Sequence, residues 1–246
     1  MNISLTMQAH EKVEQTRKNV WVMFDRIAHR YDLLNRLLSF RQDVAWRKKL
    51  ARFLPERDNL SVLDVATGTG DVLISLLKNS SKIGHAIGID MAERMLEVGR
   101  RKINTLNLEN QISLQKGDAT DIKFDDSTFD VATISFGIRN VSNLDSGIQN
   151  LFKVLKPNGR VLILEFSLPE NTLLKKLYLF YFRNILPRVG GWISGDSYAY
   201  NYLNESVETF PYGESFCEIL RKNGFKNVQF YPLTFGIATI YKGDKE

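Results

Sequence analysis

The stretch Leu60-Ser61-Val62-Leu63-Asp64-Val65-Ala66-Thr67-Gly68-Thr69-Gly70-Asp71 decides the fold of this chain. An apolar run leads into a glycine turn, and a second apolar run, His85-Ala86-Ile87-Gly88-Ile89, ends at Asp90. A strand, a glycine turn, a helix and a second strand that ends in a carboxylate are typical of a nucleotide-binding βαβ unit. The glycines let backbone N–H groups approach a ligand, and the carboxylate can bind ribose hydroxyls. We therefore predict a site for an adenosine-containing cofactor.

The residues around the turn distinguish between cofactors. The dinucleotide motif G-x-G-x-x-G needs a third glycine where the helix packs against the strand, and Leu73 stands at that position. Asp64, Ala66 and the pair Gly68 and Gly70 instead fit the D-x-G-x-G-x-G turn of S-adenosylmethionine methyltransferases, with Ala66 in place of the first glycine. We predict S-adenosylmethionine as the cofactor; an ordinary strand–turn–helix connection is the alternative.

Composition limits the classes of protein that remain. The chain has 246 residues, 43% of them hydrophobic, which is enough for a sizeable core in one domain or in one domain with a cap. No apolar run approaches the roughly 20 residues that span a bilayer. The N-terminus has no signal-peptide pattern, so we expect a cytoplasmic protein. The single cysteine, Cys217, excludes an internal disulfide and a cysteine-cluster metal site, and we predict no metal.

The basic excess of the chain lies in its N-terminal segment. Residues 1–57 contain 12 Lys and Arg against 6 Asp and Glu, whereas the remainder contains 21 against 22. Apolar and aromatic residues recur there at helical spacing, as in Val20-Trp21-Val22-Met23-Phe24 and Leu33-Leu34. We predict that two or three amphipathic helices in 1–57 cap a domain that spans 58–246. Solvated helix faces, an anionic membrane surface and nucleic acid are all compatible with the charge.

Helical and strand patterns alternate beyond the first βαβ unit. We predict helices over 92–103 and 144–155, strands over 111–116, 129–134 and 160–166, and a C-terminal hairpin of 228–231 with 237–241. Such alternation is typical of an α/β fold, in which a Rossmann-like parallel sheet carries helices on both faces and binds ligands beyond the carboxyl ends of its strands. The candidate positions are those that follow each strand: Thr69, Asp90, Asp118, Ala119, Ser135 and Arg139.

Several longer runs resemble the ubiquinone/menaquinone biosynthesis C-methyltransferase family. They are Met23-Phe24-Asp25-Arg26-Ile27-Ala28-His29-Arg30-Tyr31-Asp32-Leu33-Leu34-Asn35, the glycine turn, Ile134-Ser135-Phe136-Gly137-Ile138-Arg139-Asn140-Val141, Leu164-Glu165-Phe166-Ser167 and Tyr202-Leu203-Asn204-Glu205-Ser206. The Phe-Gly-Ile-Arg-Asn and Leu-Glu-Phe-Ser runs are the most selective of these. The resemblance implies a class I S-adenosylmethionine-dependent methyltransferase fold, with a seven-stranded, mostly parallel sheet and one antiparallel hairpin strand. A helical and aromatic lid insertion is expected around 170–215.

The resemblance also implies which residues bind the cofactor. By position they are the turn residues Asp64, Gly68, Thr69 and Gly70, then Asp90 at the ribose hydroxyls, Asp118 and Ala119 beside the adenine, and Ser135 after the fourth strand. The family often has Asn-Ala-Glu where this chain has Asp118-Ala119-Thr120, so the hydrogen bonds to adenine can differ. Capping of the following helix is the alternative for Asp90 and Asp118, and for Asp90 the two roles are compatible.

The reaction implied by the resemblance is methyl transfer to a ring carbon of a polyprenylated hydroquinol. It converts demethylmenaquinol to menaquinol, 2-polyprenyl-6-methoxy-1,4-benzoquinol to its 3-methyl product, or both. A phenol of pKa ~10 is ionised in about one part in a thousand at pH 7, so the site needs a proton acceptor or a cation beside the phenolate.

Five residues are candidates for these catalytic roles. Arg139 would supply the cation and Asn140 would orient the quinol oxygen. Tyr31 and Asp32 would complete the pocket, with Asp32 or His29 as the base. A structural Arg–carboxylate pair is the alternative for Arg139, and helix packing is the alternative for Tyr31.

A polyprenylated quinol is therefore the expected partner. The aromatic and basic run over 173–183 predicts a helix that lies at the inner membrane surface, caps the pocket or forms a homo-oligomer interface. An RNA methyltransferase is the main alternative, given the basic net charge of +5. However, the fourth strand ends in Ser-Phe-Gly-Ile-Arg-Asn and not in (Asn/Asp)-Pro-Pro-(Tyr/Phe), so we expect no nucleic-acid partner. A nicotinamide-dependent oxidoreductase, a cofactor-binding regulator and a methyltransferase of another lipid stay open.

Overall fold

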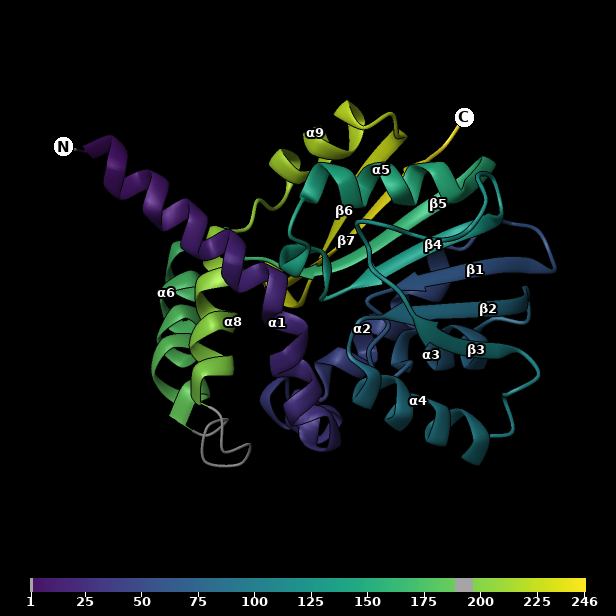
Figure 1. Ribbon diagram of the computed structural model, residues 1–246, viewed down its shortest axis with the longest axis horizontal. Helices are drawn as coiled ribbons and strands as arrows, with labels where there is room; N and C mark the ends of the chain where they lie inside the picture. The colour runs from purple at the N-terminus through teal and green to yellow at the C-terminus, as the bar shows by residue number, and fades with distance from the viewer. Residues whose placement is uncertain (1, 189–196) are drawn as a thin grey trace.

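A mixed β-sheet forms the centre of the molecule (Figure 1). The computed structural model describes the backbone of residues 2–188 and 197–246 and the side chains of residues 20–188 and 202–246. The sheet has seven strands in the order β3-β2-β1-β4-β5-β7-β6. Their bounds are β1 Leu60–Val65, β2 Ile83–Asp90, β3 Ile112–Lys116, β4 Phe129–Ser135, β5 Leu155–Phe166, β6 Lys226–Leu233 and β7 Ala238–Asp244.

The directions of the strands confirm the expected class I sheet. Neighbouring strands from β3 to β5 pair in parallel, and β7 is antiparallel to both β5 and β6. Every residue of β1 is buried, as expected for a parallel sheet that is covered on both faces. The C-terminal hairpin predicted from the sequence is present, with longer strands than predicted.

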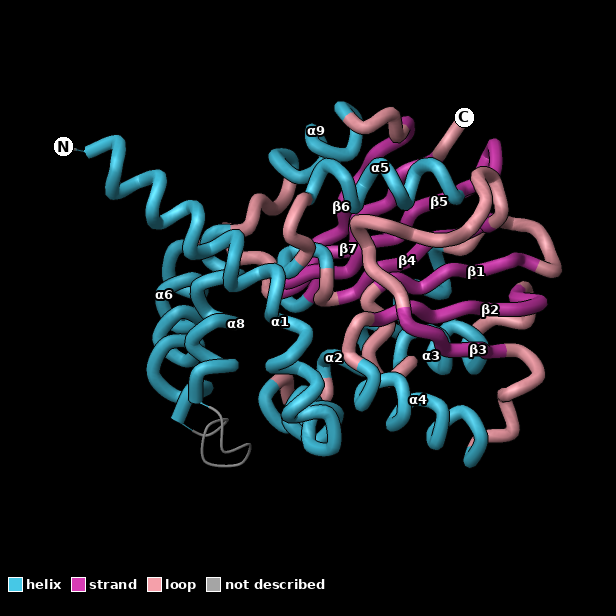
Figure 2. The backbone as a smooth tube through the Cα atoms, in the orientation of Figure 1, coloured by secondary structure: helices cyan, strands magenta, loops and turns pink. Residues whose placement is uncertain are grey.

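Helices cover both faces of the sheet, as Figure 2 shows. One face carries α2 Gln42–Leu50, α3 Asp71–Asn79 and α4 Glu93–Thr105, whose apolar residues, such as Trp46, Leu73 and Leu96, share a core cluster. The other face carries α5 Leu144–Val154 and α9 Glu214–Lys222, which bury Leu151 and Phe216 in a second cluster. The two-faced packing leaves the carboxyl ends of the parallel strands open to a ligand.

Strand β5 begins earlier than the sequence predicts. The sequence predicts a strand that begins at Arg160, but β5 begins at Leu155 and includes the run Lys156-Pro157-Asn158-Gly159. Leu155 pairs with Phe129 and Arg160 with Val131, with a register shift between these pairs. Asn158 has a positive φ of 60°, and a Cβ on Gly159 would lie 2.7 Å from the Lys156 carbonyl oxygen. The turn residues therefore form an irregularity within the strand.

The N-terminal segment folds into one long helix and one short one. Helix α1 Asn2–Leu38 has 37 residues, and α2 continues into the 3₁₀ turn η1 Ala51–Phe53. The chain turns between the two helices at Phe40 and Arg41, which both have positive φ. Buried Met23 and Leu34 of α1 pack in one cluster with Phe182 and Tyr202. Helix α1 therefore joins the sheet side of the molecule to the segment after β5.

The segment after β5 is helical, in the region where the sequence predicts a lid. It comprises α6 Thr172–Phe180, the π-helical turn η3 Tyr181–Ile185 and α8 Ser197–Thr209. Helices α6 and α8 lie on the far side of α1 from the sheet in Figure 1. Among the residues that the structure describes, no helix is long and apolar enough to cross a membrane.

Candidate active site

The glycine turn after β1 needs an unusual backbone at three positions. Ala66, Gly68 and Gly70 all have positive φ, at 52°, 55° and 74°. Glycine adopts this left-handed conformation without strain, so alanine is tolerated at the first position at some energetic cost. Gly88 on β2 lies directly against the turn, because a Cβ there would come within 2.7 Å of the Thr67 hydroxyl. The spacing of small residues thus follows from the close approach of two backbones.

Asp64 stabilises this turn from inside the core. Its carboxylate accepts hydrogen bonds from the hydroxyls of Thr67 and Thr133, and its side chain is buried. Burial raises the pKa of Asp64 to about 7, against the lowering effect of the two hydroxyls. Asp64 does not line the cavity described below. The structure thus places Asp64 inside the core, where it holds the turn in shape, and its contact with the cofactor stays a prediction.

Asp90 combines the two roles that the sequence leaves open for it. One carboxylate oxygen accepts from the Gly68 backbone N–H at 2.8 Å, and the other from the Ala92 N–H at 2.9 Å, beside the start of α4. Burial raises the pKa of Asp90 while these backbone bonds lower it. The side chain also lines the cavity at the carboxyl end of β2. Asp90 can therefore hold the turn and present carboxylate lone pairs to a ligand.

The first cavity lies at the carboxyl ends of β1, β2 and β4, beneath helix α1. Five predicted cofactor residues or positions converge on it: Gly68, Asp90, Asp118, Ala119 and Ser135. Apolar side chains from α1 and α4 complete it, among them Phe24 and Met95. The Ser135 hydroxyl is buried and has no hydrogen-bond partner among the described residues. We call this space the cofactor cavity.

Thr69 and Gly70 do not line the cofactor cavity, although both lie in the turn. The Thr69 hydroxyl donates to Asp32 at 2.7 Å and lies 3.0 Å from the Lys102 ammonium, on the outer side of the turn. Gly70 is the residue that precedes helix α3. The Thr69 hydroxyl therefore connects the turn to α1, and the assignment of Thr69 to the cofactor stays a prediction.

A second, more apolar cavity adjoins the first. Its wall comes from α1, α2, the segment α6–η3, α8 and the ends of β4 and β5, and includes Trp46, Phe166, Tyr178, Phe182 and Leu186. Phe24, Tyr31 and Phe136 line both cavities. Tyr31 packs edge-on against Phe24, and burial raises the pKa of its phenol. We call this space the apolar cavity; a molecule in it would lie next to the occupant of the cofactor cavity.

Arg139 lines the apolar cavity and also forms an ion pair with Glu165, the kind of structural pair given above as its alternative role. Its Nη1 donates to Glu165 at 2.7 Å and to the Phe136 carbonyl at 2.6 Å, and its Nε donates to Ser206 at 3.3 Å. The guanidinium lies 5.4 Å from the centre of the Phe166 ring. Burial raises the pKa of Glu165, whereas Arg139 lowers it. The cation is therefore held rigidly at the boundary of an apolar space, where a charge acts strongly.

Asn140 follows Arg139 but lines the cofactor cavity. Its side-chain oxygen accepts from the Tyr202 hydroxyl at 3.1 Å. Tyr202 lies on α8, so this bond connects the end of β4 to the helical segment that closes the apolar cavity.

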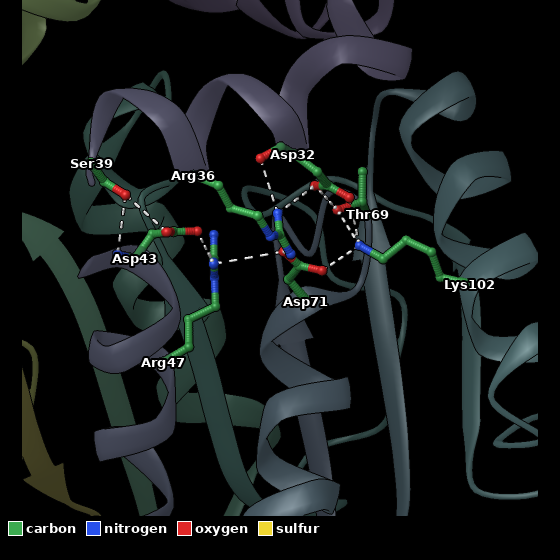
Figure 3. Close-up of polar contacts among 8 residues, drawn as sticks. All are labelled: Asp32, Arg36, Ser39, Asp43, Arg47, Thr69, Asp71 and Lys102. Atoms are coloured by element: carbon green, nitrogen blue, oxygen red, sulfur yellow. Dashed lines mark hydrogen bonds and ion pairs between the residues drawn. The ribbon is translucent and has the colours of Figure 1, made fainter. Parts of the chain in front are cut away.

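Figure 3 shows Asp32 in a polar network that also contains Asp43 and Arg47. Asp43 and Arg47 line the apolar cavity, whereas Asp32 lines neither cavity. Its carboxylate accepts from Thr69 at 2.7 Å and from Lys102 at 2.8 Å, and Lys102 also pairs with Asp71. His29 is exposed and lines an outer surface groove with Arg36 and Lys102. Neither Asp32 nor His29 lines the apolar cavity, so the structure does not bring these two predicted bases to the other candidate catalytic residues.

Comparison with known proteins assigns the chain to a family. The model of the ubiE/COQ5 methyltransferase family matches residues 10–245. The chain belongs to the ubiE/COQ5 methyltransferase family. It is 44% identical to the ubiquinone/menaquinone biosynthesis C-methyltransferase UbiE of Geotalea daltonii, over 95% of this chain and 99% of that protein. It is 39% identical to the demethylmenaquinone methyltransferase of Bacteroides fragilis, over 96% and 93%.

Solved structures agree with the fold. A methyltransferase from Thermotoga maritima, titled a possible histamine N-methyltransferase, superposes with a TM-score of 0.64 at 18% identity, over 92% of this chain and 99% of that one. A methyltransferase from Aquifex aeolicus gives a TM-score of 0.59 at 22% identity, over 81% and 89%. As a member of the ubiE/COQ5 family, the chain is a methyltransferase, and its methyl donor is S-adenosylmethionine.

The cofactor cavity suits this donor. An orphaned hydroxyl at Ser135 and a carboxylate at Asp90 offer hydrogen bonds, and Met91 and Met95 offer apolar contact for a flat ring. Asp118 already accepts from the Thr120 backbone and hydroxyl through one oxygen, which leaves its second oxygen for a ligand.

Sequence reasoning missed two residues of the apolar cavity and a third that forms an ion pair with a residue of its wall. Asp43 was not singled out, although its spacing of four from Arg47 on one helix is a signal for an ion pair. Tyr178 was counted only as part of an aromatic run. Glu165 was noted only within a family motif, since no local pattern shows that it meets Arg139.

Proposed function

We propose that this member of the ubiE/COQ5 family methylates a ring carbon of a polyprenylated quinol: demethylmenaquinol, 2-polyprenyl-6-methoxy-1,4-benzoquinol, or both. The observation that carries this proposal is the apolar, aromatic cavity that shares Phe24, Tyr31 and Phe136 with the cofactor cavity. A flat ring beside Tyr31 would meet the methyl donor across this shared boundary. The names of the two relatives above, which refer to menaquinone and ubiquinone, support the same class of substrate.

The polar groups of the apolar cavity suit the ionisation of a quinol. Asp43 is the only carboxylate residue among the described residues that line it. Its oxygens accept from Ser39 at 2.8 Å and from Arg47 at 2.6 Å, which leaves lone pairs free. We assign Asp43 as the acceptor of the quinol proton and Arg139 as the cation that stabilises the resulting phenolate. Tyr31 would pack against the ring, and Asn140 would orient groups at the cofactor side.

The atoms and charges of the reaction balance with these roles. The quinol hydroxyl loses its proton to Asp43, and the ring carbon becomes nucleophilic. The donor supplies its methyl group as the C–S bond breaks, and the electron pair of that bond stays on sulfur. The ring carbon then loses its own hydrogen as a proton, which leaves to solvent, and the proton held by Asp43 returns to the quinol oxygen, so that the aromatic quinol and the Asp43 carboxylate are restored. The protein's contribution is to hold the carbon in line with the methyl group, which can supply roughly 7–11 kcal/mol of the barrier reduction.

The proposal is tested with methyl-labelled S-adenosylmethionine. Chemically reduced demethylmenaquinone and the demethylated methoxybenzoquinol are supplied in parallel, and labelled products are identified by mass. Label on a ring carbon of either quinol supports the proposal and defines the ring preference. If the protein binds the donor but methylates neither quinol, the proposed substrate class is wrong, and other lipids and RNA become the candidates.

Substitution of Asp43 tests its role as acceptor. We expect Asp43→Asn to lower the methylation rate at pH 7 by at least about 100-fold, in the range of general-base effects. The rate should recover as the pH rises toward the phenol pKa of ~10, because the quinol then ionises without help. Ser39→Ala is the matched control, since it removes a hydrogen bond to Asp43 at 2.8 Å but leaves the carboxylate. A pH profile of Asp43→Asn parallel to that of the wild type would contradict the assignment.

The outer face of α6 supports peripheral contact with a membrane. Leu173, Leu177 and Phe180 form one exposed stripe at helical spacing, 66%, 59% and 61% exposed, next to exposed Lys176. The opposite face of the same segment supplies Tyr178 and Phe182 to the apolar cavity. We infer that the stripe rests on the lipid surface, so that a prenyl tail passes from the bilayer into the cavity. Serine at all three stripe positions should reduce flotation with anionic vesicles without changing methylation of a short-tailed quinol; unchanged flotation would contradict the inference.

A further inference from the structure

The hydroxyl of Tyr178 is the least expected polar group in the apolar cavity. Its ring stacks on Phe182, with centroids 5.0 Å apart and an interplanar angle of 26°. The hydroxyl is buried and has no hydrogen-bond partner among the described residues. Buried hydroxyls are nearly always paired, because an unpaired one loses its bonds to water without replacement. The orphaned group therefore indicates a ligand that is present when the protein works.

Other tyrosines of the same wall show the usual behaviour. The Tyr181 hydroxyl donates to the Leu38 carbonyl at 2.9 Å, and the Tyr202 hydroxyl donates to Asn140 at 3.1 Å. Tyr181 lies only three residues from Tyr178 and lines the same cavity. The absence of a protein partner is thus a property of the Tyr178 position and not of the helical segment as a whole.

Arg139 provides a second free donor at the boundary of this cavity. Its Nη1 and Nε are bonded to Phe136, Glu165 and Ser206, whereas its Nη2 has no hydrogen-bond partner in the described parts of the chain. Tyr178 and Arg139 line the same cavity. Burial raises the pKa of Tyr178, and the Arg139 charge lowers it. Because burial dominates, the phenol stays protonated and can only donate to an anionic oxygen.

We propose that the Tyr178 hydroxyl binds one ring oxygen of the quinol, donating a hydrogen bond to it in concert with Nη2 of Arg139. Two donors on one oxygen stabilise its ionised form and fix the rotation of the ring relative to the methyl donor. Tyr178 is therefore a substrate-binding residue that sets which ring carbon faces the cofactor cavity. This inference rests on the proposed quinol substrate and adds a residue that recognises it.

The test compares Tyr178→Phe with Tyr181→Phe in the full chain. Tyr178→Phe should raise the KM for demethylmenaquinol roughly 10- to 100-fold, the range expected for loss of a hydrogen bond to a charged oxygen. The limb of its kcat–pH profile that reports ionisation of the quinol should move to higher pH, because the ionised oxygen loses a hydrogen-bond donor. The Kd for S-adenosylmethionine should stay at the wild-type value. Tyr181 also lines the apolar cavity, so Tyr181→Phe serves as the control for stability. The control for the KM is Tyr231→Phe, which removes a hydroxyl bonded to Gln229 and lies outside both cavities; it should leave the KM within about threefold.

Thermal unfolding of the ligand-free protein provides a readout besides activity. Tyr178→Phe should keep or raise the Tm, by about 2–4 °C, since it removes an unpaired buried hydroxyl. Tyr181→Phe should lower the Tm, since it breaks a formed bond. A variant that is more stable yet binds quinol less well is the signature of a group kept for a ligand.

Three outcomes separate this inference from the function on which it rests. If wild-type protein methylates neither quinol, the proposed function fails and the inference fails with it. If the wild type is active and Tyr178→Phe keeps the wild-type KM and pH profile, only the inference is overturned. Mono-hydroxy analogues of the naphthoquinol, each lacking one ring oxygen, supply the last arm. The inference requires that the analogue without the oxygen bound by Tyr178 has the same affinity for wild type and for Tyr178→Phe. If wild type binds both analogues more tightly than Tyr178→Phe does, by the same factor, the inference is overturned.

Discussion

The cofactor cavity and the apolar cavity adjoin each other but are built in different ways. The first is formed largely by residues directly after strands, such as Gly68, Asp90 and Ser135, whose positions follow from the sheet. The second is assembled from side chains of α1, α2 and the helical segment after β5, which lie far apart in the sequence. The position of the cofactor cavity therefore follows from the fold of the sheet, whereas the apolar cavity depends on the added helices.

The two cavities also differ in the groups that balance their charged side chains. In the cofactor cavity, the Asp90 carboxylate is balanced by backbone N–H groups. In the apolar cavity, the Arg139 cation is balanced by buried Glu165. A backbone donor is removed only by a substitution to proline, whereas many substitutions remove a member of a side-chain pair. The apolar cavity should therefore be the more sensitive of the two to single substitutions.

The largest effect is expected at Arg139. Arg139→Leu leaves Glu165 buried without its cation, which should lower the free energy of unfolding by about 3–5 kcal/mol at neutral pH. Loss of Arg139 raises the pKa of Glu165 further above its unfolded value of ~4.3. The destabilisation is therefore absent below that value and grows as the pH rises through the folded-state pKa. Urea unfolding at several pH values measures it.

The double variant Arg139→Leu with Glu165→Leu separates structure from chemistry. It should recover most of the lost stability, since no unpaired charge remains buried. Methylation should stay at least about 100-fold below wild type, because the phenolate loses its cation. Normal methylation in a stable double variant would mean that the pair serves the fold alone.

A second prediction concerns the pH dependence of stability at Asp64, which holds the glycine turn after β1. The pKa of buried Asp64 is raised to about 7 from an ordinary value near ~3.9. Asp64 therefore contributes stability below about pH 4 that is lost as the pH rises to about 7, by on the order of 4 kcal/mol. Asp64→Asn should remove this component from the pH profile of unfolding.

Asp130 offers a control of opposite sign. Burial alone would raise its pKa, but Ser61 and Lys156 lower it. Its contribution is thus present above its unfolded pKa of ~3.9 and lost as the pH falls through the lower folded-state value. Asp130→Asn should flatten only the acid side of the profile. Identical profiles for the two variants would contradict the opposite shifts.

The third prediction tests the independence of the cofactor cavity. Asp90→Asn replaces a charged acceptor by an amide, and should weaken S-adenosylmethionine binding by roughly 10- to 100-fold in calorimetry. Quinone binding in the apolar cavity should change by less than about twofold, because Asp90 lines only the cofactor cavity. An equal loss in both affinities would show that the two cavities act as a single site.

The smallest effect is expected at Lys102, which belongs to the network of Figure 3 but lines neither cavity. Lys102 connects Asp32 of α1 to Asp71 of α3 and is partly exposed. Lys102→Met should cost about 1 kcal/mol of stability, in the range of partly screened ion pairs. Because α1 lines both cavities, a few-fold loss of affinity should appear for both ligands together. Glu56→Gln, which affects a single exposed pair with Lys82, is the control and should change neither affinity.

The acid dependence of this network follows from Asp71. Burial would raise the pKa of Asp71, but Lys102, Arg47 and Arg36 lower it overall. Its stabilising contribution is therefore present above the unfolded pKa of ~3.9 and is lost as the pH falls through the folded-state value. Protease protection of the α1–α2 segment, followed from pH 6 to pH 3, should decline in that range in wild type and less so in Asp71→Asn.

The sequence by itself determined the sheet, the glycine turn and most of the cofactor side. Asp90, Asp118 and Ser135 could be placed because the residue after each parallel strand reaches the same edge. The antiparallel hairpin and the family could also be predicted, since both depend on continuous stretches of the sequence. The sequence could not show that the side chains of Asp64 and Thr69 point away from the cavity, into the core and toward α1.

Only the tertiary structure decided the apolar cavity. Asp32 was expected at the substrate and lies in the outer network, whereas Asp43, eleven residues later in the printed sequence, lines the cavity. The pairing of Arg139 with Glu165 and the isolation of the Tyr178 hydroxyl likewise depend on how separate helices meet. A helix pattern predicts which side chains share a face, but not which neighbour that face will meet, because packing between distant segments sets the rotation of each helix.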